Sequence, residues 1–389
     1  MIETNFKDTE IGKIPADWEV TDIFNLTEVV TGGTPNTNMR EYWGGNIRWM
    51  NSGELNLKFV HEVQGRITQL GYNHSSTKQI PANCVLIGLA GQGKTRGTAA
   101  YNLIPLCINQ SIGAIIPKET FSSLFLYYYI DSKYSELRRL SSGEGGRGGL
   151  TKQLLLSFVV PLPNISEQRR IAAALSKVDS LIESIDKLIA KKQAIKKGAM
   201  QELLTGKKRL PGFKGEWIKK KVLDIAPLQR GFDLPNSLLQ RGDYPVVYSN
   251  GIGYYNKTYM CKAPGVITGR SGTIGNVTFI PKGYYWPHNT TLWVTSFKGN
   301  EPLYISYLYK SLHFEDFMTG TGVPTLNRNS IHALQLIIPT LSEQRAIAHV
   351  LSSMDSEIEA LERKRDKYKQ VKQGMMQDLL TGRIRLTEN

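Results

Sequence analysis

The 389-residue sequence has few of the residue types that build disulfide frameworks and metal sites. Its three cysteines, Cys84, Cys107 and Cys261, are odd in number and form neither a CxxC pair nor any other metal-ligand spacing. The six histidines lie far apart in the sequence. We therefore expect neither disulfide bonds nor a bound metal ion.

Long apolar runs are also absent. None approaches the roughly 18 to 20 residues that a membrane-spanning helix requires, and the amino-terminal stretch MIETNFKDTEIG is acidic and polar, unlike a signal peptide. These absences predict a cytoplasmic protein without membrane contact. Hydrophobic residues make up 41% of the chain and charged residues 21%, a composition typical of globular proteins that argues against disorder of the whole chain.

One segment of 48 residues occurs twice. Residues 163–210 and 339–386 align without a gap, and 24 of the 48 positions are identical. Both copies carry SEQR near the start and LLTG near the end. Identity over this length indicates an internal duplication.

Each copy of the repeat predicts a long helix, because apolar residues recur at alternating spacings of four and three, the heptad pattern. We expect each helix to begin at Ser-Glu-Gln with the serine as N-cap. It would run about 34 residues, roughly 50 Å, to Gly198 or Gly374, and a short turn closed by a second glycine would follow. With one apolar stripe each, the two helices should pack on each other. The expected pairing positions are Ile171, Leu175, Val178, Ile182, Ile185, Ile189, Ile347, Leu351, Met354, Ile358 and Leu361.

The net charge of +14 is concentrated in the repeats. Residues 191–221 carry +9 and residues 363–385 carry +6, so the rest of the chain is close to neutral. A basic stripe attracts phosphate backbones through a salt-dependent, sequence-independent term. A solvated helix face or an acidic partner protein are the alternative explanations.

The duplication extends upstream of the helices. The segment IPADWEV at residues 14–20 is similar to PGFKGEW at residues 211–217, and a glycine follows each tryptophan by fourteen residues, at Gly32 and Gly231. Between these anchors the two globular heads barely align, which suggests one task performed twice on different targets. We expect strands and loops with small helices such as SSLFLYYYIDSKY and LYISYLYKSL.

The segment GLAGQGKT, residues 88–95, satisfies the Walker A pattern of phosphate-binding loops. A phosphate cradle requires a helix directly after the loop. The downstream sequence RGTAAYNLIP has no helical period and reaches Pro105. We therefore favour a glycine-rich β-turn and keep a P-loop nucleotidase as an alternative.

In combination, the segments SEQRRIAAAL…LLTG, SEQRAIAHVL…LLTG, GGTPNTN…EYWGGNIRW and GRSGTIGNV resemble the DNA-sequence-specificity subunit of type I restriction-modification systems. The resemblance covers essentially the whole chain. It implies an α+β fold in which two mixed, mostly β target-recognition domains are separated by two long helices. These helices would pack as an antiparallel coiled coil with pseudo-twofold symmetry. The implied domains are residues 1–160, the first target-recognition domain; 161–209, the first helical region; 210–336, the second target-recognition domain; and 337–389, the second helical region.

The resemblance also implies partners. Each head would read one half of a split site in double-stranded DNA, two methyltransferase subunits would dock on the helices, and restriction subunits would join the larger complex. S-adenosylmethionine would bind the methyltransferase subunit, and ATP and Mg²⁺ the restriction subunit, so this chain would need no cofactor. Accordingly, the sequence shows no Asn/Asp-Pro-Pro-aromatic loop to hold a flipped base, no glycine-rich methyl-donor site and no Walker B acids, and we expect no catalytic centre.

Polar and aromatic residues near expected turns are the candidates for DNA contact, because such side chains can reach base edges or phosphates. Plain hairpin turns and hydrogen bonding within the fold remain the alternatives for these positions. In the first head they are Arg40, Tyr42, Asn46, Arg48, Gln92, Lys94, Arg96, Asn109, Gln110, Arg147 and Lys152. In the second head they are Arg270, Ser271, Thr273, His288, Asn289 and Arg328.

The leading hypothesis is therefore a non-catalytic specificity subunit. A related recognition module that serves a fused or separately encoded restriction-methylation enzyme of another type is the second hypothesis.

Overall fold

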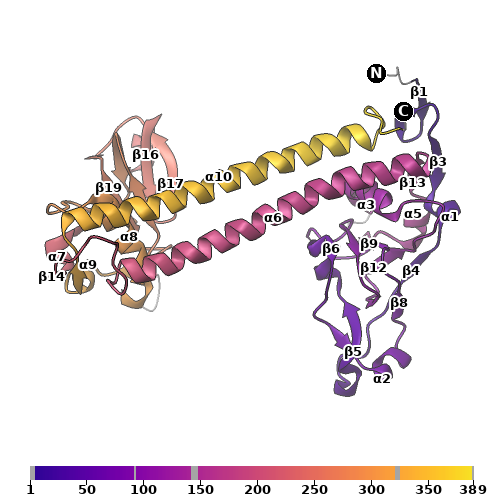
Figure 1. Ribbon diagram of the computed structural model, residues 1–389, viewed down its shortest axis with the longest axis horizontal. Helices are drawn as coiled ribbons and strands as arrows, with labels where there is room; N and C mark the ends of the chain where they lie inside the picture. Colours follow the sequence, from indigo (N-terminus) through magenta and orange to yellow (C-terminus); the bar gives the residue numbers. More distant parts are fainter. Residues whose placement is uncertain (1–4, 92, 142–147, 320–324, 388–389) are drawn as a thin grey trace. The chain divides into compact units, whose positions relative to one another are not determined.

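The computed structural model describes residues 5–91, 93–141, 148–319 and 325–387 (Figure 1). Its contacts divide the chain into two compact units. The first unit contains residues 1–184 and 365–389, and the second contains residues 185–364. Each unit therefore combines one globular head with part of both repeated segments, a division that cuts across the four segments expected from the sequence.

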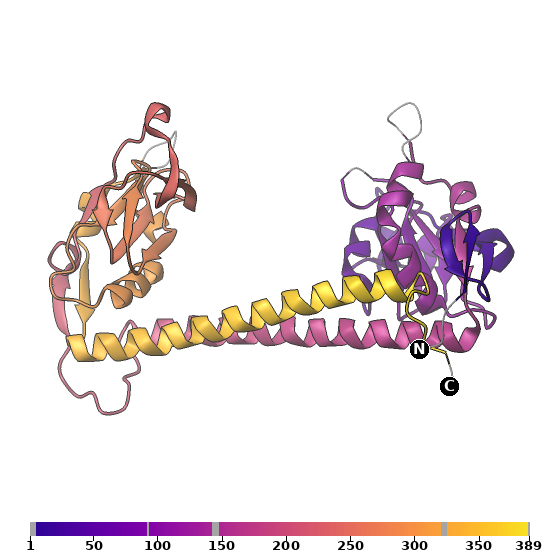
Figure 2. The ribbon, with the colours of Figure 1, turned by 90° about the horizontal axis from the view of Figure 1, so that it is seen from above.

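The repeated segments form two helices of 39 residues each, α6 (Ile165–Leu203) and α10 (Leu341–Leu379). In the first unit the start of α6 lies beside the end of α10, where Lys372 Nζ lies 2.7 Å from Asp179 Oδ1. In the second unit the end of α6 lies beside the start of α10, where Lys192 Nζ lies 2.6 Å from Glu357 Oε1 (Figures 1 and 2). The two helices are thus antiparallel, and the expected α+β fold with paired long helices is confirmed.

The expected helix ends were wrong. Both helices continue through Gly198 and Gly374, where a side chain would meet open space, and the cost of about 1 kcal/mol for a helical glycine is small beside the packing of the flanking turns. The terminating glycines are Gly206 and Gly382, which adopt φ values of +72° and +70°. The start of α6 also differs from expectation, because Asn164 Oδ1, rather than the Ser166 hydroxyl, accepts the hydrogen bond of the Glu167 amide at 2.8 Å.

The first head contains two main sheets, with strand orders β4-β12-β9-β10-β6 and β7-β5-β11-β8, and the two-stranded sheets β1-β2 and β13-β3. Its strands are β1 (Phe6–Thr9), β2 (Gly12–Pro15), β3 (Glu19–Asp22), β4 (Val29–Thr31), β5 (Trp43–Met50), β6 (Phe59–Val60), β7 (Arg66–Ile67), β8 (Lys78–Ile80), β9 (Val85–Gly88), β10 (Ala99–Asn102), β11 (Leu106–Ile108), β12 (Ile112–Ile115) and β13 (Val159–Leu162). Its helices are α1 (Ile23–Leu26), η1 (Arg40–Tyr42), η2 (Ser52–Leu57), α2 (Gln69–Asn73), α3 (Ser123–Ser132), α4 (Tyr134–Leu140) and α5 (Lys152–Leu156).

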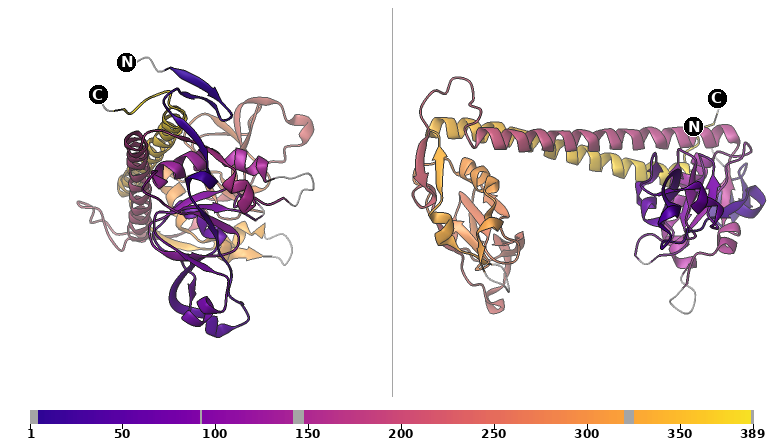
Figure 3. Two further views of the ribbon diagram at one scale, coloured as in Figure 1. Left: turned by 90° about the vertical axis from the view of Figure 1, so that its right-hand side faces the viewer. Right: turned by 90° about the horizontal axis from the view of Figure 1, so that it is seen from below.

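The second head contains the sheets β15-β22-β19-β20 and β17-β16-β21-β18, with the pairs β14-β25 and β23-β24. Its strands are β14 (Ile218–Lys221), β15 (Leu228–Arg230), β16 (Arg241–Tyr248), β17 (Gly251–Asn256), β18 (Cys261–Lys262), β19 (Gly265–Gly269), β20 (Val277–Ile280), β21 (Tyr284–Pro287), β22 (Thr291–Val294), β23 (Met318–Thr319), β24 (Thr325–Leu326) and β25 (Gln335–Ile338). Its helices are α7 (Val222–Ile225), η3 (Asn236–Leu238), α8 (Pro302–Ser311), η4 (Phe314–Phe317) and α9 (Arg328–His332). Helix α8 lies between the long helices and the β19-containing sheet (Figure 3).

The two heads share one topology although their sequences barely align. The strands β4, β12, β9 and β10 of the first head are matched in order by β15, β22, β19 and β20 of the second. The second sheet of each head has a parallel pair at its centre, β11 with β5 and β21 with β16. The expected small helices are confirmed as α3 and α8, which pack on the sheets that contain β9 with β10 and β19 with β20.

The heptad positions serve two different cores. Ile171 and Leu175 pack in a cluster with residues of the first head and with Leu379 and Leu380 of α10. Ile347 and Leu351 belong to the matching cluster of the second head. The expectation that these four positions pair helix with helix was therefore incomplete, because the heads supply most of their apolar surroundings. Ile185, Ile189 and Ile358 are buried further along the helices, whereas Val178, Ile182, Met354 and Leu361 are half-buried.

Within the described part of the chain, no helix combines the length and apolar character needed to cross a membrane.

Candidate nucleic-acid interface

The glycine-rich segment of the first head is a hairpin loop. It joins β9 to β10, which pair antiparallel, so a strand rather than a helix follows the loop. Gly91, Gly93 and Gly97 hold φ values of +119°, +78° and +81°, which favour glycine. A Walker A loop leads directly into a helix. The hairpin expected from the sequence is confirmed, and the P-loop alternative lacks its defining element.

The body of the first head braces this loop. Arg138 Nη1 donates to the Gly93 carbonyl at 2.7 Å, and the Tyr134 hydroxyl donates to the Lys94 carbonyl at 3.2 Å. The Lys94 side chain is exposed, whereas Arg96 is half-buried and donates from Nη1 to the Gly148 carbonyl. Lys94 is thus an exposed cation on a loop whose backbone is held by the body of the head. Gln92 and Arg147, two further candidates, lie outside the described residues.

Asn109 and Gln110 lie beside the segment that follows β4. The Gly33 amide donates to the Ile108 carbonyl at 3.0 Å, and Thr34 Oγ1 donates to Gln110 Oε1 at 2.5 Å. Asn109 is buried and its Oδ1 accepts from the Ser111 amide at 3.1 Å, so it shapes the turn. Gln110 is exposed and remains the member of this pair that can reach a ligand.

The remaining candidates of the first head are distributed over several elements. Tyr42 stacks on His74 with ring centroids 6.0 Å apart. Arg48 Nε lies 3.0 Å from Glu62 Oε1, and this hydrogen bond lowers the pKa of Glu62 to about 2. Arg40 on η1, Asn46 on β5 and Lys152 at the start of α5 are exposed.

The candidates of the second head converge on one turn. The amides of Arg270 and Ser271 both donate to the Thr290 carbonyl, at 2.9 and 3.2 Å. His288 lies in the same turn, where its Nδ1 is 3.0 Å from Thr290 Oγ1, and Asn289 Nδ2 donates to Asp233 Oδ1. Four of the six candidates in this head are therefore neighbours.

The backbone of this turn matches the corresponding turn of the first head. In the first head the Leu89 amide donates to the Ser111 carbonyl, and in the second head the Arg270 amide donates to the Thr290 carbonyl. A second pair of backbone hydrogen bonds also matches: the Asn109 amide donates to the Met50 carbonyl, and the His288 amide donates to the Val247 carbonyl. These hydrogen bonds make residues 109–111 and 288–290 corresponding stretches of the two heads. The side chains at matched positions differ, so the two heads present different chemistry on one framework.

Thr273 and Arg328 are also exposed. Thr273 supplies a carbonyl that would lie 1.8 Å from a Cβ at Gly269, so this close approach requires glycine. Arg328 begins α9 and lines a cavity with Arg270 and Arg230. Arg230 was not among the candidates, because the second head gives no sequence motif at the end of β15.

Sequence reasoning also missed a pair of matched ionic networks that tie the long helices to the heads. In the first unit, buried Glu167 accepts from Trp18 Nε1 at 3.1 Å and from Arg385 Nε at 2.8 Å. In the second unit, Glu343 accepts from Trp217 Nε1 at 3.2 Å and from Arg209 Nε at 2.7 Å. Each guanidinium also lies over the ring of its tryptophan, 5.7 Å from Trp18 and 5.8 Å from Trp217.

A second pair of matched ionic networks lies further along the two long helices. In the first unit, Asp179 accepts from the Tyr128 hydroxyl at 2.7 Å and pairs with Lys372. In the second unit, Asp355 accepts from the Tyr307 hydroxyl at 2.6 Å and pairs with Lys196. The signal was present in the sequence, because the acidic and basic members are identical in both copies of the repeat.

These networks revise the expectation for the basic stripe. Several cations of the stripe pair with carboxylates of a long helix. Lys192, Lys196 and Arg209 pair with carboxylates of α10, whereas Lys372 and Arg385 pair with carboxylates of α6. Part of the positive charge is therefore structural. Lys208, Arg363 and Arg365 also lie near carboxylates of their own segments.

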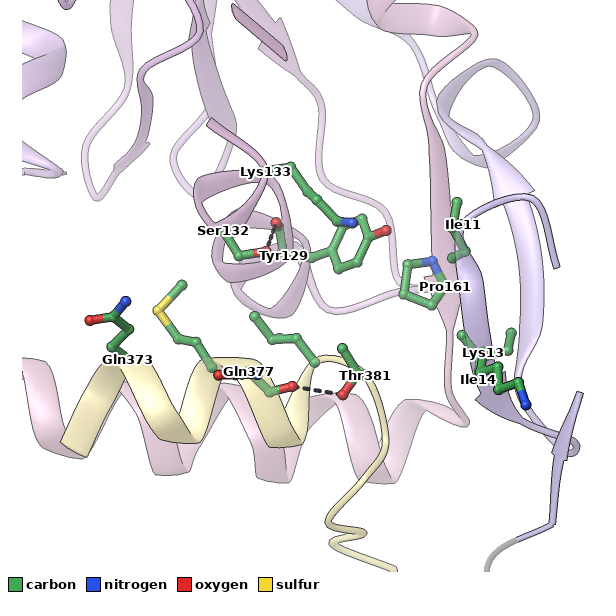
Figure 4. Close-up of a pocket in the computed structure, with 12 residues that line it drawn as sticks. Ile11, Lys13, Ile14, Tyr129, Ser132, Lys133, Pro161, Gln373, Gln377 and Thr381 are labelled. Atoms are coloured by element: carbon green, nitrogen blue, oxygen red, sulfur yellow. Dashed lines mark hydrogen bonds between the residues drawn. The ribbon is translucent and has the colours of Figure 1, made fainter. Parts of the chain in front are cut away.

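A cavity of about 340 Å³ lies in the first unit between the β1-β2 hairpin, α3 and the last turns of α10 (Figure 4). Its lining combines apolar residues, among them Ile14, Met376 and Leu380, with the cations of Lys13 and Lys133. Lys133 also pairs with a carboxylate of α4, at 3.4 Å. Among the lining residues that the structure describes there is no aspartate, glutamate, histidine or cysteine, and the cavity can hold an apolar side chain or small group.

The three thiols are buried. Burial raises the pKa of Cys84 to about 12 and the pKa of Cys107 and Cys261 to about 11, so each remains a neutral thiol at pH 7. Among the described residues, no group of three or more His, Cys, Asp or Glu side chains is placed to hold a metal ion.

Comparison with known proteins agrees with this architecture. The model of the type I restriction modification DNA specificity domain matches residues 15–194 and again residues 214–370. The type I restriction enzyme MjaIX specificity subunit of Methanocaldococcus jannaschii is 36% identical over 189 residues, 47% of this chain and 42% of that protein. The EcoR124I/EcoR124II specificity subunit of Escherichia coli is 35% identical over 158 residues, 40% of this chain and 39% of that protein.

These two matches span less than half the length of either relative. The MjaVIII specificity subunit of M. jannaschii is 23% identical over 425 residues, which cover 99% of this chain and 97% of that protein.

Among solved structures, the S subunit of a type I restriction-modification system from M. genitalium has the same fold. Its TM-score is 0.65 at 14% identity, with 97% of each chain covered. The repeated heads, the paired helices and the double family match lead to one conclusion: the chain belongs to the type I restriction modification DNA specificity domain family.

Proposed function

We propose that this chain is a specificity subunit that reads a split site in double-stranded DNA, one half with each head, and that it carries the methyltransferase and restriction subunits. The observation that carries the proposal is the matched turn of the two heads. It has the same backbone hydrogen bonds in both, yet buried Leu89 and exposed Gln110 stand in the first head where Arg270 and Asn289 stand in the second. A constant frame with exchanged side chains is what recognition of two different base sequences requires.

Side-chain chemistry supports DNA as the ligand. In the first head, Lys94 extends from the braced hairpin loop and Gln110 is exposed beside Thr34. In the second, Arg270, His288 and Asn289 surround one turn. Amide, imidazole and guanidinium groups can bond to base edges in the major groove, and the lysine can neutralise phosphate.

The long helices would carry the partners. Their ionic networks point inward to the heads and to the other helix, whereas Leu188 and Ile195 of α6 and Val371 of α10 are exposed large apolar residues. Exposed apolar residues on a charged helix surface are suited to a protein partner. We assign these faces to two methyltransferase subunits, with restriction subunits joining the larger complex.

Catalysis would belong to those partners. S-adenosylmethionine would bind the methyltransferase subunits, and ATP with Mg²⁺ the restriction subunits. This chain would contribute sequence reading and positioning in the cytoplasm and would perform no chemistry of its own.

The test is a head exchange. The intact system, in which residues 20–150 are replaced by the matching head of another such subunit, is expressed in cells, and methylated adenines are mapped by sequencing. We expect one half of the methylated sequence to change while the other half and the gap between them remain. The matched control replaces the second head only, and the opposite half should change. A change in both halves after either exchange would contradict reading by separate heads.

A further inference from the structure

The second head contains a cavity of about 450 Å³ with three arginines in its wall. Arg230 ends β15, Arg270 follows β19 and Arg328 begins α9, so the three come from distant parts of the sequence. Leu292 and residues 325–327 complete the lining. The walls thus combine a concentrated positive charge with a small apolar surface.

Arg270 is held rigidly at this cavity. Its amide donates to the Thr290 carbonyl at 2.9 Å, and its carbonyl accepts from the Leu326 amide at 2.8 Å. Its Nη1 lies 3.4 Å from the Asn289 carbonyl, and the side chain is half-buried. The backbone on both sides of the residue is fixed, and most of the N–H groups of the guanidinium remain available for a ligand.

The protein supplies little negative charge to balance the three arginines. Arg230 Nη2 lies 3.7 Å from Asp233 Oδ1, and this carboxylate is largely exposed. Over the described ranges of the chain, neither Arg270 nor Arg328 forms an ion pair. Burial, together with the charge of Arg230, lowers the pKa of Arg270. An anion would relieve the repulsion between these cations.

The cluster belongs to the second head alone. The Leu89 carbonyl accepts from the Leu150 amide as the Arg270 carbonyl accepts from Leu326, so Leu89 occupies the position of Arg270. Thr31 ends β4 where Arg230 ends the matching β15, and Lys152 begins α5 where Arg328 begins α9. The first head therefore has one cation where the second has three, and the cluster is not needed for the shared fold.

We propose that this cavity binds a backbone phosphate of the DNA on the second head, with Arg270 fixed at the centre and Arg230 and Arg328 closing on the oxyanion from the rim. The proposal rests on the proposed function. Three guanidinium groups match the planar, forked hydrogen bonding that a phosphate accepts. The asymmetry between the heads makes the second head the more dependent on salt-sensitive contacts.

The test uses the full chain in complex with its methyltransferase subunits and a duplex that contains the methylated site. Binding is measured by fluorescence anisotropy over a series of salt concentrations for the wild type, Arg270→Ala, Arg270→Lys and Lys282→Ala. Lys282 is exposed in the same head outside the cavity and gives a matched loss of charge. Thermal unfolding of each variant establishes that it is folded.

We expect Arg270→Ala to weaken DNA binding about tenfold and to reduce the slope of log affinity against log salt by about one. The loss should be the same for matched and mismatched second half-sites, and the mapped methylation sequence should not change. Arg270→Lys should restore the slope with part of the affinity, because it keeps the charge and loses the fork. Lys282→Ala should affect neither quantity to this extent.

Other results would overturn the proposal. An unchanged affinity in a folded Arg270→Ala complex would show that the cavity lies off the DNA, while binding by the wild type would leave the proposed function intact. An unchanged slope with lost discrimination at the second half-site would make Arg270 a reader of base edges. Inorganic phosphate that binds the complex saturably without competing with DNA would make the cavity a site for free anions.

Discussion

Arg385 and Glu167 form a doubly hydrogen-bonded ion pair, with Nε to Oε1 and Nη2 to Oε2 both at 2.8 Å, although 218 residues separate them in the chain. The Glu167 side chain is fully buried and the Arg385 side chain is 16% exposed. Arg385 also hydrogen-bonds Asp17 and thereby lowers the pKa of that carboxyl. One residue thus joins the end of the chain, the start of α6 and the first head.

We predict that Arg385→Ala destabilises the first unit by about 3 kcal/mol, because it leaves a buried carboxylate without its cation. Arg209→Ala should have the same effect on the second unit, where Arg209 pairs with buried Glu343. Native-state hydrogen exchange distinguishes the two units, since only the unit with the substitution should lose protection.

Arg383→Ala is the control for these variants, because Arg383 is exposed, lies two residues from Arg385 and carries the same charge. It should change the free energy of unfolding by less than about 0.5 kcal/mol. Equal losses in Arg383→Ala and Arg385→Ala would show that the effect is one of net charge and not of the buried pair.

The second head should lose stability in mildly acidic solution. His332 Nε2 accepts the hydrogen bond of the Leu228 amide at 2.9 Å, which requires the neutral ring, and burial together with Arg328 lowers its pKa below 6.5. As the pH falls from 6.5, the unfolded chain binds a proton that the folded head excludes, so stability is present above this pH and declines below it. Denaturant unfolding of the full chain between pH 7.5 and about 5 measures the decline.

Substitution identifies the group responsible for this pH dependence. His332→Gln keeps a neutral acceptor and should flatten the profile. Burial also lowers the pKa of His288, against the opposing charge of Asp233, so the double variant with His288→Gln should be flatter still. His313→Gln, at an exposed position, should leave the profile as in the wild type. A profile unaffected by His332→Gln would remove this residue from the explanation.

The loop at residues 88–95, which matches the Walker A pattern, should bind DNA and not nucleotide. We expect the isolated chain to bind no ATP in equilibrium dialysis. Lys94→Ala should weaken DNA binding and reduce the salt slope by about one if the lysine contacts a single phosphate. Lys118→Ala removes another exposed lysine of the same head and provides the comparison. Saturable ATP binding that disappears in Lys94→Ala would restore the P-loop assignment.

Ile358→Asp should cost about 3 kcal/mol or more, because it places a carboxylate in an apolar site on α10 where the wild-type side chain is 7% exposed. Ile182→Asp should cost less, since Ile182 is only half-buried. Chemical denaturation measures both. Ser356→Asp, which introduces the same charge at an exposed position two residues from Ile358, should be nearly neutral, and a comparable loss there would indicate helix propensity as the cause.

The repeat and its periodicity were sufficient to predict the two long helices, because heptad spacing depends only on local geometry. The helix ends could not be predicted from the sequence, because they depend on tertiary packing and not on local spacing. Gly198 is a residue type that often ends a helix, yet the helical turns on both sides of it continue α6 up to Leu203. Propensity is a weak signal that tertiary packing overrides.

The site was predictable in kind and only partly in detail. The glycine-rich segments at residues 88–95 and 269–277 were visible in the sequence, and the structure places them between corresponding strands, β9–β10 and β19–β20. Arg230 escaped detection, because its meeting with Arg270 and Arg328 depends on strand order and not on any spacing in the sequence. The partnership of Glu167 with Arg385 is similarly non-local.

The interleaved division of the chain also fixes an order of events during synthesis. A ribosome delivers residues from the amino terminus, so the second unit has all of its residues, 185–364, before the last segment of the first unit has been translated. Until residues 365–389 emerge, Asp179 lacks Lys372 and Glu167 lacks Arg385. The head that is made first is therefore completed last, and until then two of its carboxylates lack the cations that pair with them.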